Sequence, residues 1–154
     1  MQSFTLKLSA IHFPIEFLGF QMAVQKQVAA LPVRRINGKT EVLLVTSRDT
    51  GRWIIPKGWQ EKGLKAYESA AREAKEEAGV EGKINPKAIG HFQYIKTERS
   101  DQGAIDVTVF LLSVRKVLKR WREAAQRERA WFPIEAAAGT VQEPELSSII
   151  SALK

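Results

Sequence analysis

The stretch "GWQEKGLKAYESAAREAKEEAGV", from Gly58 to Val80, decides the fold and the site of this 154-residue chain. From Leu64 onward, apolar and small residues recur every three or four positions, which predicts an amphipathic helix. Gly79 follows as the kind of residue that commonly ends a helix. The expected core face of this helix consists of Leu64, Tyr67, Ala71, Ala74 and Ala78.

The last turns of this predicted helix carry three glutamates, Glu73, Glu76 and Glu77. Their spacing places them on one helix face, where like charges destabilise by about 0.2–0.5 kcal/mol per pair. They also oppose the helix dipole, at about 0.3–1 kcal/mol each. A bound hard cation such as Mg²⁺, which prefers oxygen ligands, resolves this conflict. On spacing alone, a plain acidic surface remains the alternative.

The loop before the helix suits an anionic ligand. A glycine loop that runs into a helix lets the backbone approach a ligand closely. Gly58 could present its carbonyl to the same metal, and Lys57 could meet a phosphate as a point charge. The alternative is that Gly58 and Gly63 only form turns.

The stretch resembles the Nudix box, G-x5-E-x7-R-E-U-x-E-E-x-G-U, in which U is a bulky aliphatic residue. The matching positions are Gly58, Arg72, Glu73, Glu76, Glu77, Gly79 and Val80. There are two departures, because Leu64 replaces the first glutamate and Ala74 is a small version of the aliphatic position. In the family the first glutamate mainly braces the loop and helix. Either Glu68 or Glu61 could substitute for it here.

Further segments, "EVLLVTSR", "WIIPKG" and "WFPIEAA…VQEPEL", resemble the diphosphoinositol polyphosphate and diadenosine polyphosphate hydrolase branch of the family. The likeness covers about residues 27–154. It implies an α/β fold, a Nudix-type α/β/α sandwich with a mixed β-sheet, for a domain over residues 22–154. Residues 1–21 are expected to be an N-terminal extension or an added strand.

The residue pattern also predicts elements outside the box. Asn37–Lys39 is a strong hairpin turn signal. Pro144 suits the first position of a helix. The other expected elements are strands over 27–36, 40–48, 53–55, 87–96 and 104–114, a loop over 56–63, a basic loop or frayed helix over 115–129, a strand and short helix over 129–138, and a final amphipathic helix.

The resemblance implies Mg²⁺-dependent hydrolysis, with Mn²⁺ as a substitute, of phosphoanhydride bonds in a nucleoside diphosphate linked to another group. The expected substrates are diadenosine polyphosphates or diphosphoinositol polyphosphates. The enzyme alternatives are ADP-ribose, nucleoside triphosphates and RNA 5′ ends. The alternative from a different class of protein is a catalytically weak nucleotide- or RNA-binding module. Leu64 and the basic stretch over 115–129 suggest it, whereas the retained Glu73, Glu76 and Glu77 argue against it.

The same resemblance assigns roles to individual residues. Glu73 and Glu77 are the expected main metal ligands, supported by Glu76 and the Gly58 carbonyl, while Arg72 orients the carboxylates. Either Glu73 or Glu123 is the general base, and the expected catalytic residues are Glu73, Arg72 and Glu76. The expected substrate contacts are Lys57, Arg34, Arg48 and Trp59, with Lys96 and Arg99 nearby. The Trp59 ring either stacks on a base or covers the loop.

Charge and composition limit the partners of the chain. The formal net charge of +7 favours anionic partners, above all a small polyphosphate, with nucleic acid as a less favoured partner. There is no cysteine, which excludes disulfides and thiol chemistry and fits a reducing, cytoplasmic location. No apolar run reaches the roughly 18 residues of a membrane-spanning helix. The oligomeric state is not predicted.

Overall fold

A computed structural model of the protein describes residues 24–95 and 103–154. The predicted extension over 1–21 and the candidate contacts Lys96 and Arg99 lie outside these residues. The strands are β1 (Gln25–Ile36), β2 (Lys39–Thr46), β3 (Trp53–Ile54), β4 (Lys57–Trp59), β5 (Val80–Ile84), β6 (Gly90–Ile95), β7 (Ala104–Val117) and β8 (Arg129–Pro133). The helices are α1 (Ala66–Glu73), the π-helical turn η2 (Ala74–Ala78), α2 (Ile134–Thr140) and α3 (Pro144–Ser151).

The strands form one mixed sheet with the order β3-β2-β1-β7-β5, to which β4, β6 and β8 add by pairing with β1, β7 and β2. At its centre β1 runs parallel to β7, from the Gln25–Ile105 pair to the Val33–Ser113 pair. The other pairings are antiparallel. The mixed sheet predicted from the sequence is therefore confirmed.

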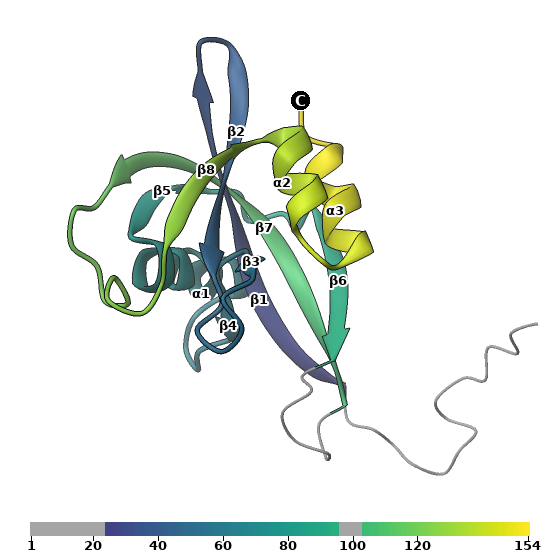
Figure 1. Ribbon diagram of the computed structural model, residues 1–154. Coiled ribbons are helices and arrows are strands. Elements are labelled where there is room, and N and C mark those ends of the chain that lie inside the picture. The colour runs from purple at the N-terminus through teal and green to yellow at the C-terminus, as the bar shows by residue number, and fades with distance from the viewer. Residues whose placement is uncertain (1–23, 96–102) are drawn as a thin grey trace, which may run out of the picture.

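Helices cover both faces of this sheet, with α1 and η2 on one side and α2 and α3 on the other (Figure 1). The alternation of side chains along β1 supplies both interfaces. Val28 and Ala30 belong to the core under α1 and η2, whereas Ala29 and Leu31 belong to the core under α2 and α3. The expected α/β/α layering follows from this division. No helix in the described ranges is long and apolar enough to cross a bilayer.

Local signals place several element ends. Asn37 and Gly38 both have positive φ, 51° and 75°, as a two-residue hairpin turn of the primed type requires. Gly79 ends η2 in the left-handed conformation with φ of 64°, which a glycine adopts without strain. Pro144 occupies the start of α3. These three predictions are confirmed.

Other expectations are wrong in detail. Residues 57–59, expected as loop, form β4 because their backbone pairs with β1. Residues 80–84 form β5, which was not predicted, and 115–117 extend β7 instead of opening a loop. Helix α1 begins at Ala66, and Ala70 rather than Ala71 is buried beside Ala74 and Ala78. Pairing between distant strands explains the strand errors, since local periodicity carries no record of it.

Candidate active site

A cavity of about 690 Å³ opens beside β4, between the end of η2, the turn after β2, strand β6 and the segment over 118–128. This volume lies within the usual range for small-ligand pockets. The cavity brings together eight residues that the sequence singled out: Arg48, Lys57, Gly58, Trp59, Glu73, Glu76, Glu77 and Glu123.

Arg34 is not brought to this cavity. Its guanidinium pairs with the Glu41 carboxylate at 2.8 Å and lies 4.1 Å from the ring centre of Trp131. The pairing of β1 with β2 fixes Arg34 opposite Glu41, three residue pairs from the hairpin turn, and Arg34 does not line the cavity. Its position therefore does not support the predicted contact between Arg34 and the substrate.

Arg72 lies on the outer side of the helix, where it binds two carboxylates. Its Nη1 donates to Glu61 at 2.7 Å and its Nε donates to Glu76 at 3.3 Å. Of the two possible substitutes for the missing first glutamate, the structure places Glu61 against Arg72. Glu68 instead accepts the backbone N–H of Lys65 at 3.1 Å and so caps the start of α1.

Glu77 is the most enclosed of the three glutamates, with a side chain 8% exposed. Its Oε2 accepts the backbone N–H of Lys57 at 3.2 Å, and its Oε1 accepts from Arg127 Nη2 at 3.2 Å. Burial raises the pKa of Glu77 to about 7, although the charges of Arg127 and Lys57 oppose that rise. The carboxylate is thus anchored to β4 and to a buried cation.

Glu73 faces Gly58 across the cavity. A Cβ atom at position 58 would overlap the Glu73 carboxylate, so any other residue there would require this flexible side chain to move. Burial, and then the negative charges of Glu77 and Glu76, raise the pKa of Glu73 to about 8. Within the described residues no hydrogen bond or ion pair reaches this carboxylate, which leaves its oxygens available to a ligand.

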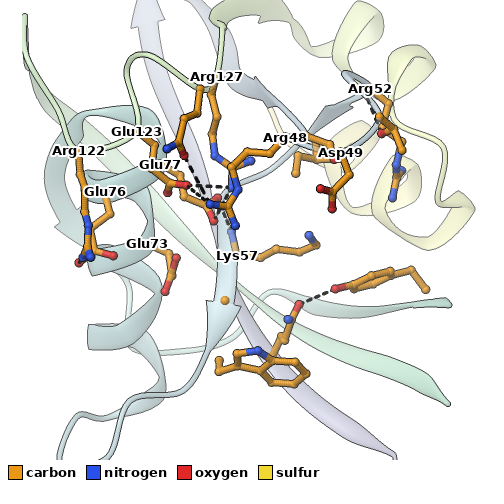
Figure 2. A pocket seen from close by; sticks show the side chains of 18 of the residues that line it. Arg48, Asp49, Arg52, Lys57, Glu73, Glu76, Glu77, Arg122, Glu123 and Arg127 are labelled. Atoms are coloured by element: carbon orange, nitrogen blue, oxygen red, sulfur yellow. Dashed lines mark hydrogen bonds and ion pairs between the residues drawn. The ribbon is translucent and has the colours of Figure 1, made fainter. Parts of the chain in front are cut away.

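The three carboxylates line the same cavity but point toward different neighbours (Figure 2). Glu76 turns outward to Arg72 and Arg122, at 3.3 and 3.2 Å, while Glu73 and Glu77 face β4. Residues 24–95 and 103–154 contain no group of three or more acidic, histidine or cysteine side chains already arranged as metal ligands. The winding of 74–78 as a π-helix, with the Gly79 N–H bonded to the Ala74 carbonyl, changes the spacing that an α-helix would give.

These oxygens nevertheless fit a hard divalent cation in their chemistry. The donors are carboxylates, the preferred ligands of Mg²⁺. The glycine at 58 leaves room beside Glu73 where any side chain would intrude. The mutual repulsion of Glu73, Glu76 and Glu77 contributes to the raised pKa of Glu73, and a divalent ion would remove that repulsion.

Residues 118–129 stabilise the C-terminal end of η2, where the three glutamates oppose the helix dipole. Trp121 Nε1 donates to the Glu77 carbonyl at 3.1 Å, and the Glu123 N–H donates to the Glu76 carbonyl at 3.1 Å. Arg129 Nη1 reaches the Ala78 carbonyl at 2.9 Å, and its guanidinium lies 3.7 Å from the Trp121 ring centre. The positive charge of Arg129 at the helix C-terminus thus offsets part of the unfavourable negative charge of the glutamates. From the sequence alone, a bound metal was the group expected to offset this charge.

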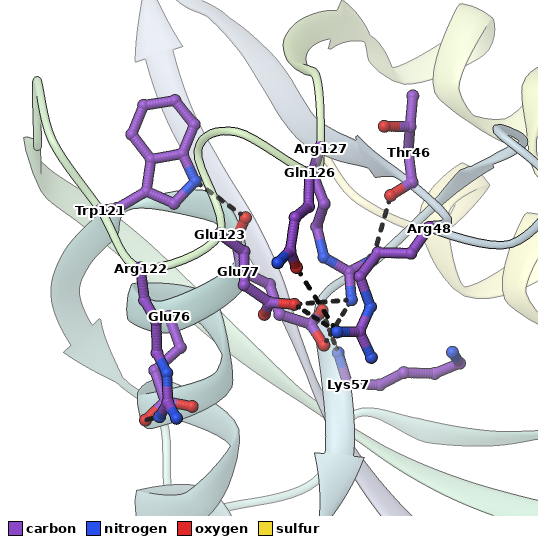
Figure 3. A network of polar contacts seen from close by, with 10 residues as sticks. All are labelled: Thr46, Arg48, Lys57, Glu76, Glu77, Trp121, Arg122, Glu123, Gln126 and Arg127. Atoms are coloured by element: carbon purple, nitrogen blue, oxygen red, sulfur yellow. Dashed lines mark hydrogen bonds and ion pairs between the residues drawn. The ribbon is translucent and has the colours of Figure 1, made fainter.

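Arg127 is one of the cavity residues that the sequence did not single out. Its side chain, 6% exposed, joins the carboxylates of Glu77 and Glu123 at 3.2 and 3.4 Å and donates to the Thr46 carbonyl at 3.0 Å (Figure 3). Its buried Nε has no partner among the described residues. The basic composition of 115–129 was a signal, but it did not show which arginine turns inward.

The opposite side of β4 has a different character. Because side chains alternate along a strand, Lys57 and Trp59 point away from the face on which Gly58 meets Glu73. Lys57 Nζ lies 4.8 Å from the ring centre of Tyr94, and burial lowers the pKa of Lys57. Trp59 is 49% exposed at the cavity wall. The cavity therefore has a carboxylate side, formed by Glu73, Glu76, Glu77 and Glu123, and an aromatic side, formed by Gln27, Lys57, Trp59 and Tyr94.

Known proteins resemble this chain in sequence and in fold. The family model for the NUDIX domain matches residues 25–152. Diphosphoinositol polyphosphate phosphohydrolase 3-beta of Bos taurus is 35% identical over 120 residues, which is 76% of this chain and 70% of the relative. The 3-alpha protein of Mus musculus is 37% identical over the same shares of the two chains.

Solved structures share the fold. A Caenorhabditis elegans Ap4A hydrolase binary complex matches with a TM-score of 0.62 and 23% identity, over 83% of this chain and 93% of that one. A MutT protein from Methanosarcina mazei matches with a TM-score of 0.64 and 22% identity, over 86% and 94% of the two chains. At these identities the likeness concerns the fold alone.

Proposed function

Because the chain belongs to the NUDIX domain family, we propose that it is a pyrophosphohydrolase that cleaves phosphoanhydride bonds with the help of Mg²⁺. Its substrates are diadenosine polyphosphates or diphosphoinositol polyphosphates, the latter being named in its curated relatives. The observation that carries the proposal is the pair of cavity-lining glutamates, Glu73 and Glu77, with raised pKa values, of which Glu73 lies against Gly58.

The proposed metal site uses the oxygens of the carboxylate side. Glu73 and Glu77 would hold Mg²⁺, with Glu76 and the Gly58 backbone as supporting groups. When bound, the ion would neutralise phosphate charge and lower the pKa of a bound water. Arg72 keeps Glu76 in place through the 3.3 Å contact. Mn²⁺ would be accepted as well, because both ions favour oxygen ligands.

In the proposed reaction a water oxygen attacks one phosphorus atom, and the bond from that phosphorus to the bridging oxygen breaks. The bridging oxygen leaves with the second phosphate group, and the proton of the water passes to a base. Glu73 is the preferred base, since it has no cation partner among the described residues. Glu123, the alternative, is engaged at 3.4 Å by both Arg48 and Arg127. Lys57 and Arg48 would bind the phosphates as charged donors.

A substrate panel tests this function. The full-length protein is incubated with Mg²⁺ and, separately, with a diadenosine polyphosphate, a diphosphoinositol polyphosphate, ADP-ribose and a nucleoside triphosphate. We expect phosphate release from at least one of the first two and loss of turnover when EDTA is added. Turnover of none of them, together with salt-sensitive RNA binding, would instead favour the binding-module alternative.

A further inference from the structure

The carbonyl groups at the C-terminal end of η2 are bonded by one distant stretch of chain, residues 118–129, here called the capping segment. The last carbonyls of a helix have no partner within the helix and are left to other groups. In order along 76–79, the donors are the Glu123 N–H at 3.1 Å, Trp121 Nε1 at 3.1 Å, Arg129 Nη1 at 2.9 Å and the Leu118 N–H at 2.8 Å. Every carbonyl from 76 to 79 is thus bonded from the capping segment.

Arg129 joins the two parts of this arrangement. Its Nη1 also reaches the Gly79 carbonyl at 3.2 Å, and its Nη2 donates to the Leu118 carbonyl at 2.7 Å. One planar guanidinium therefore connects the helix end to the capping segment. No carboxylate pairs with Arg129 among the described residues, so its hydrogen bonds all serve the backbone.

Trp121 and Arg129 lie outside the cavity that contains the carboxylates. Neither residue lines that cavity of about 690 Å³. They lie behind the helix end, where a Cβ atom at position 79 would overlap both Arg129 Nη1 and the Trp121 ring. Any effect of these two residues on the site therefore passes through the backbone of η2.

This backbone carries one of the two expected main metal ligands, Glu77. Residues 74–78 wind as a π-helix, a rare form that occurs mostly as single turns and often at functional sites. The Glu77 carboxylate accepts from Arg127 at 3.2 Å, and the Glu77 carbonyl accepts from Trp121 at 3.1 Å. Both donors belong to the capping segment, so one piece of chain fixes the backbone and the carboxylate of the same ligand.

We propose that Trp121 and Arg129 are positioning residues for the metal site: they fix the π-helical turn and thereby the place of the Glu77 carboxylate. The proposal rests on the function proposed above, because it takes Glu77 as a ligand of the divalent ion. It gives the two residues a part in metal affinity, which a role in folding alone would not give them.

Binding of Mn²⁺ to the full-length protein without substrate tests this role. The electron paramagnetic resonance signal of the free ion is followed during a titration, at a temperature at which each variant is folded. Trp121→Phe removes the Nε1 donor but keeps a ring, whereas Arg129→Met removes three hydrogen bonds. Each should weaken Mn²⁺ binding roughly tenfold, the usual size of effect for groups that orient metal ligands. Arg129→Lys, which keeps a charged donor, should recover part of the affinity.

Two matched variants control for charge and for the loss of an indole. Arg120→Met removes an exposed arginine of the capping segment that has no bonded partner among the described residues. Trp53→Phe changes a partly buried tryptophan that packs on the core under α2 and α3. Both should leave Mn²⁺ affinity within about twofold of the native value.

Melting curves separate positioning from simple stabilisation. If Trp121→Phe and Arg129→Met lowered the melting temperature but left the Mn²⁺ affinity of the folded protein unchanged, the positioning role would be overturned. Equal weakening of Mn²⁺ binding by Arg120→Met would overturn it as well, because the effect would then follow from net charge.

Hydrolysis is measured separately, so that the two proposals can fail independently. Trp121→Phe should raise the Mn²⁺ concentration needed for half the maximal rate, while the rate at saturating Mn²⁺ stays within a few-fold of the native one. Mn²⁺ binding that depends on Trp121 and Arg129, without turnover of any substrate in the panel, would overturn the hydrolase and support the positioning role. Turnover with an Mn²⁺ affinity that no variant changes would do the reverse, and a native protein that bound no Mn²⁺ would overturn both.

Discussion

The carboxylate side and the aromatic side of the cavity are separated by a single short strand, yet they differ in almost every physical property. On the carboxylate side, burial and nearby negative charges raise the pKa values of Glu73 and Glu77, and arginines from a distant segment pair with Glu76 and Glu77. On the aromatic side, neutral groups form the wall and Lys57 is the cation without an ion-pair partner among the described residues. Because side chains alternate along β4, the strand can present different groups to the carboxylate side and to the aromatic side.

Because the carboxylate side carries the proposed metal ligands, changes on it should reduce the rate for every substrate. Glu77→Gln is expected to have the largest effect, a loss in kcat of roughly a hundredfold or more, because it removes an anionic ligand and leaves Arg127 partly unpaired. Steady-state kinetics with both substrate classes measure it. Glu81→Gln, a change at a partly exposed glutamate of β5 that does not line the cavity, serves as the control. A selective loss for one substrate class would contradict the division.

Gly58→Ala tests the boundary between the two sides. The added Cβ would displace the Glu73 carboxylate, so we expect roughly a tenfold fall in activity with little change in stability, because the end of a flexible side chain can move at low cost. Gly139→Ala is a matched control, since a Cβ there meets nothing within 4 Å. Urea unfolding and kcat/KM report the two effects. A Gly58→Ala protein as active as the native one would show that Glu73 need not keep its position.

The stability of the metal-free protein should depend on pH through the same glutamates. The unfolded chain releases the Glu73 proton near 4.5, whereas the folded chain holds it until about pH 8. The associated stability is present below 4.5 and is lost as the pH rises toward 8.

Melting temperatures in EDTA should therefore fall between pH 5 and 8, and added Mg²⁺ should restore more stability at pH 8 than at pH 5. Glu73→Gln should flatten the metal-free profile. A stabilisation by Mg²⁺ that is the same at both pH values would speak against these glutamates as the ligands.

The smallest effect is expected at the position where the box departs from its pattern. Leu64→Glu should change the affinity for Mg²⁺ by no more than a few-fold, because Glu61 already pairs with Arg72 at 2.7 Å. Calorimetric titration with Mg²⁺ measures it. A gain of more than tenfold would mean that position 64 limits metal binding and that Glu61 does not substitute for the missing glutamate.

Local sequence was sufficient for those features that depend on nearby residues. The turn at Asn37–Lys39, the glycine end of the helix and the proline at the start of α3 each follow from the conformations that these residues allow. The same local pattern placed Arg34 within the strand predicted over 27–36. It could not show that Arg34 would be paired with Glu41, because that contact depends on the register of two strands.

The sequence by itself determined which donors stand near one another along the helix: Glu73, Glu76 and Glu77 come within five residues, and a glycine precedes them at a fixed distance. Tertiary structure alone decided where each carboxylate points, because Arg127 is 50 residues from Glu77 along the chain. It also assembled the aromatic side, since Tyr94 and Gln27 are 67 residues apart and meet because β6 and β1 both pair with β7. Periodicity describes the face of one element, whereas these contacts depend on how distant elements pair and pack.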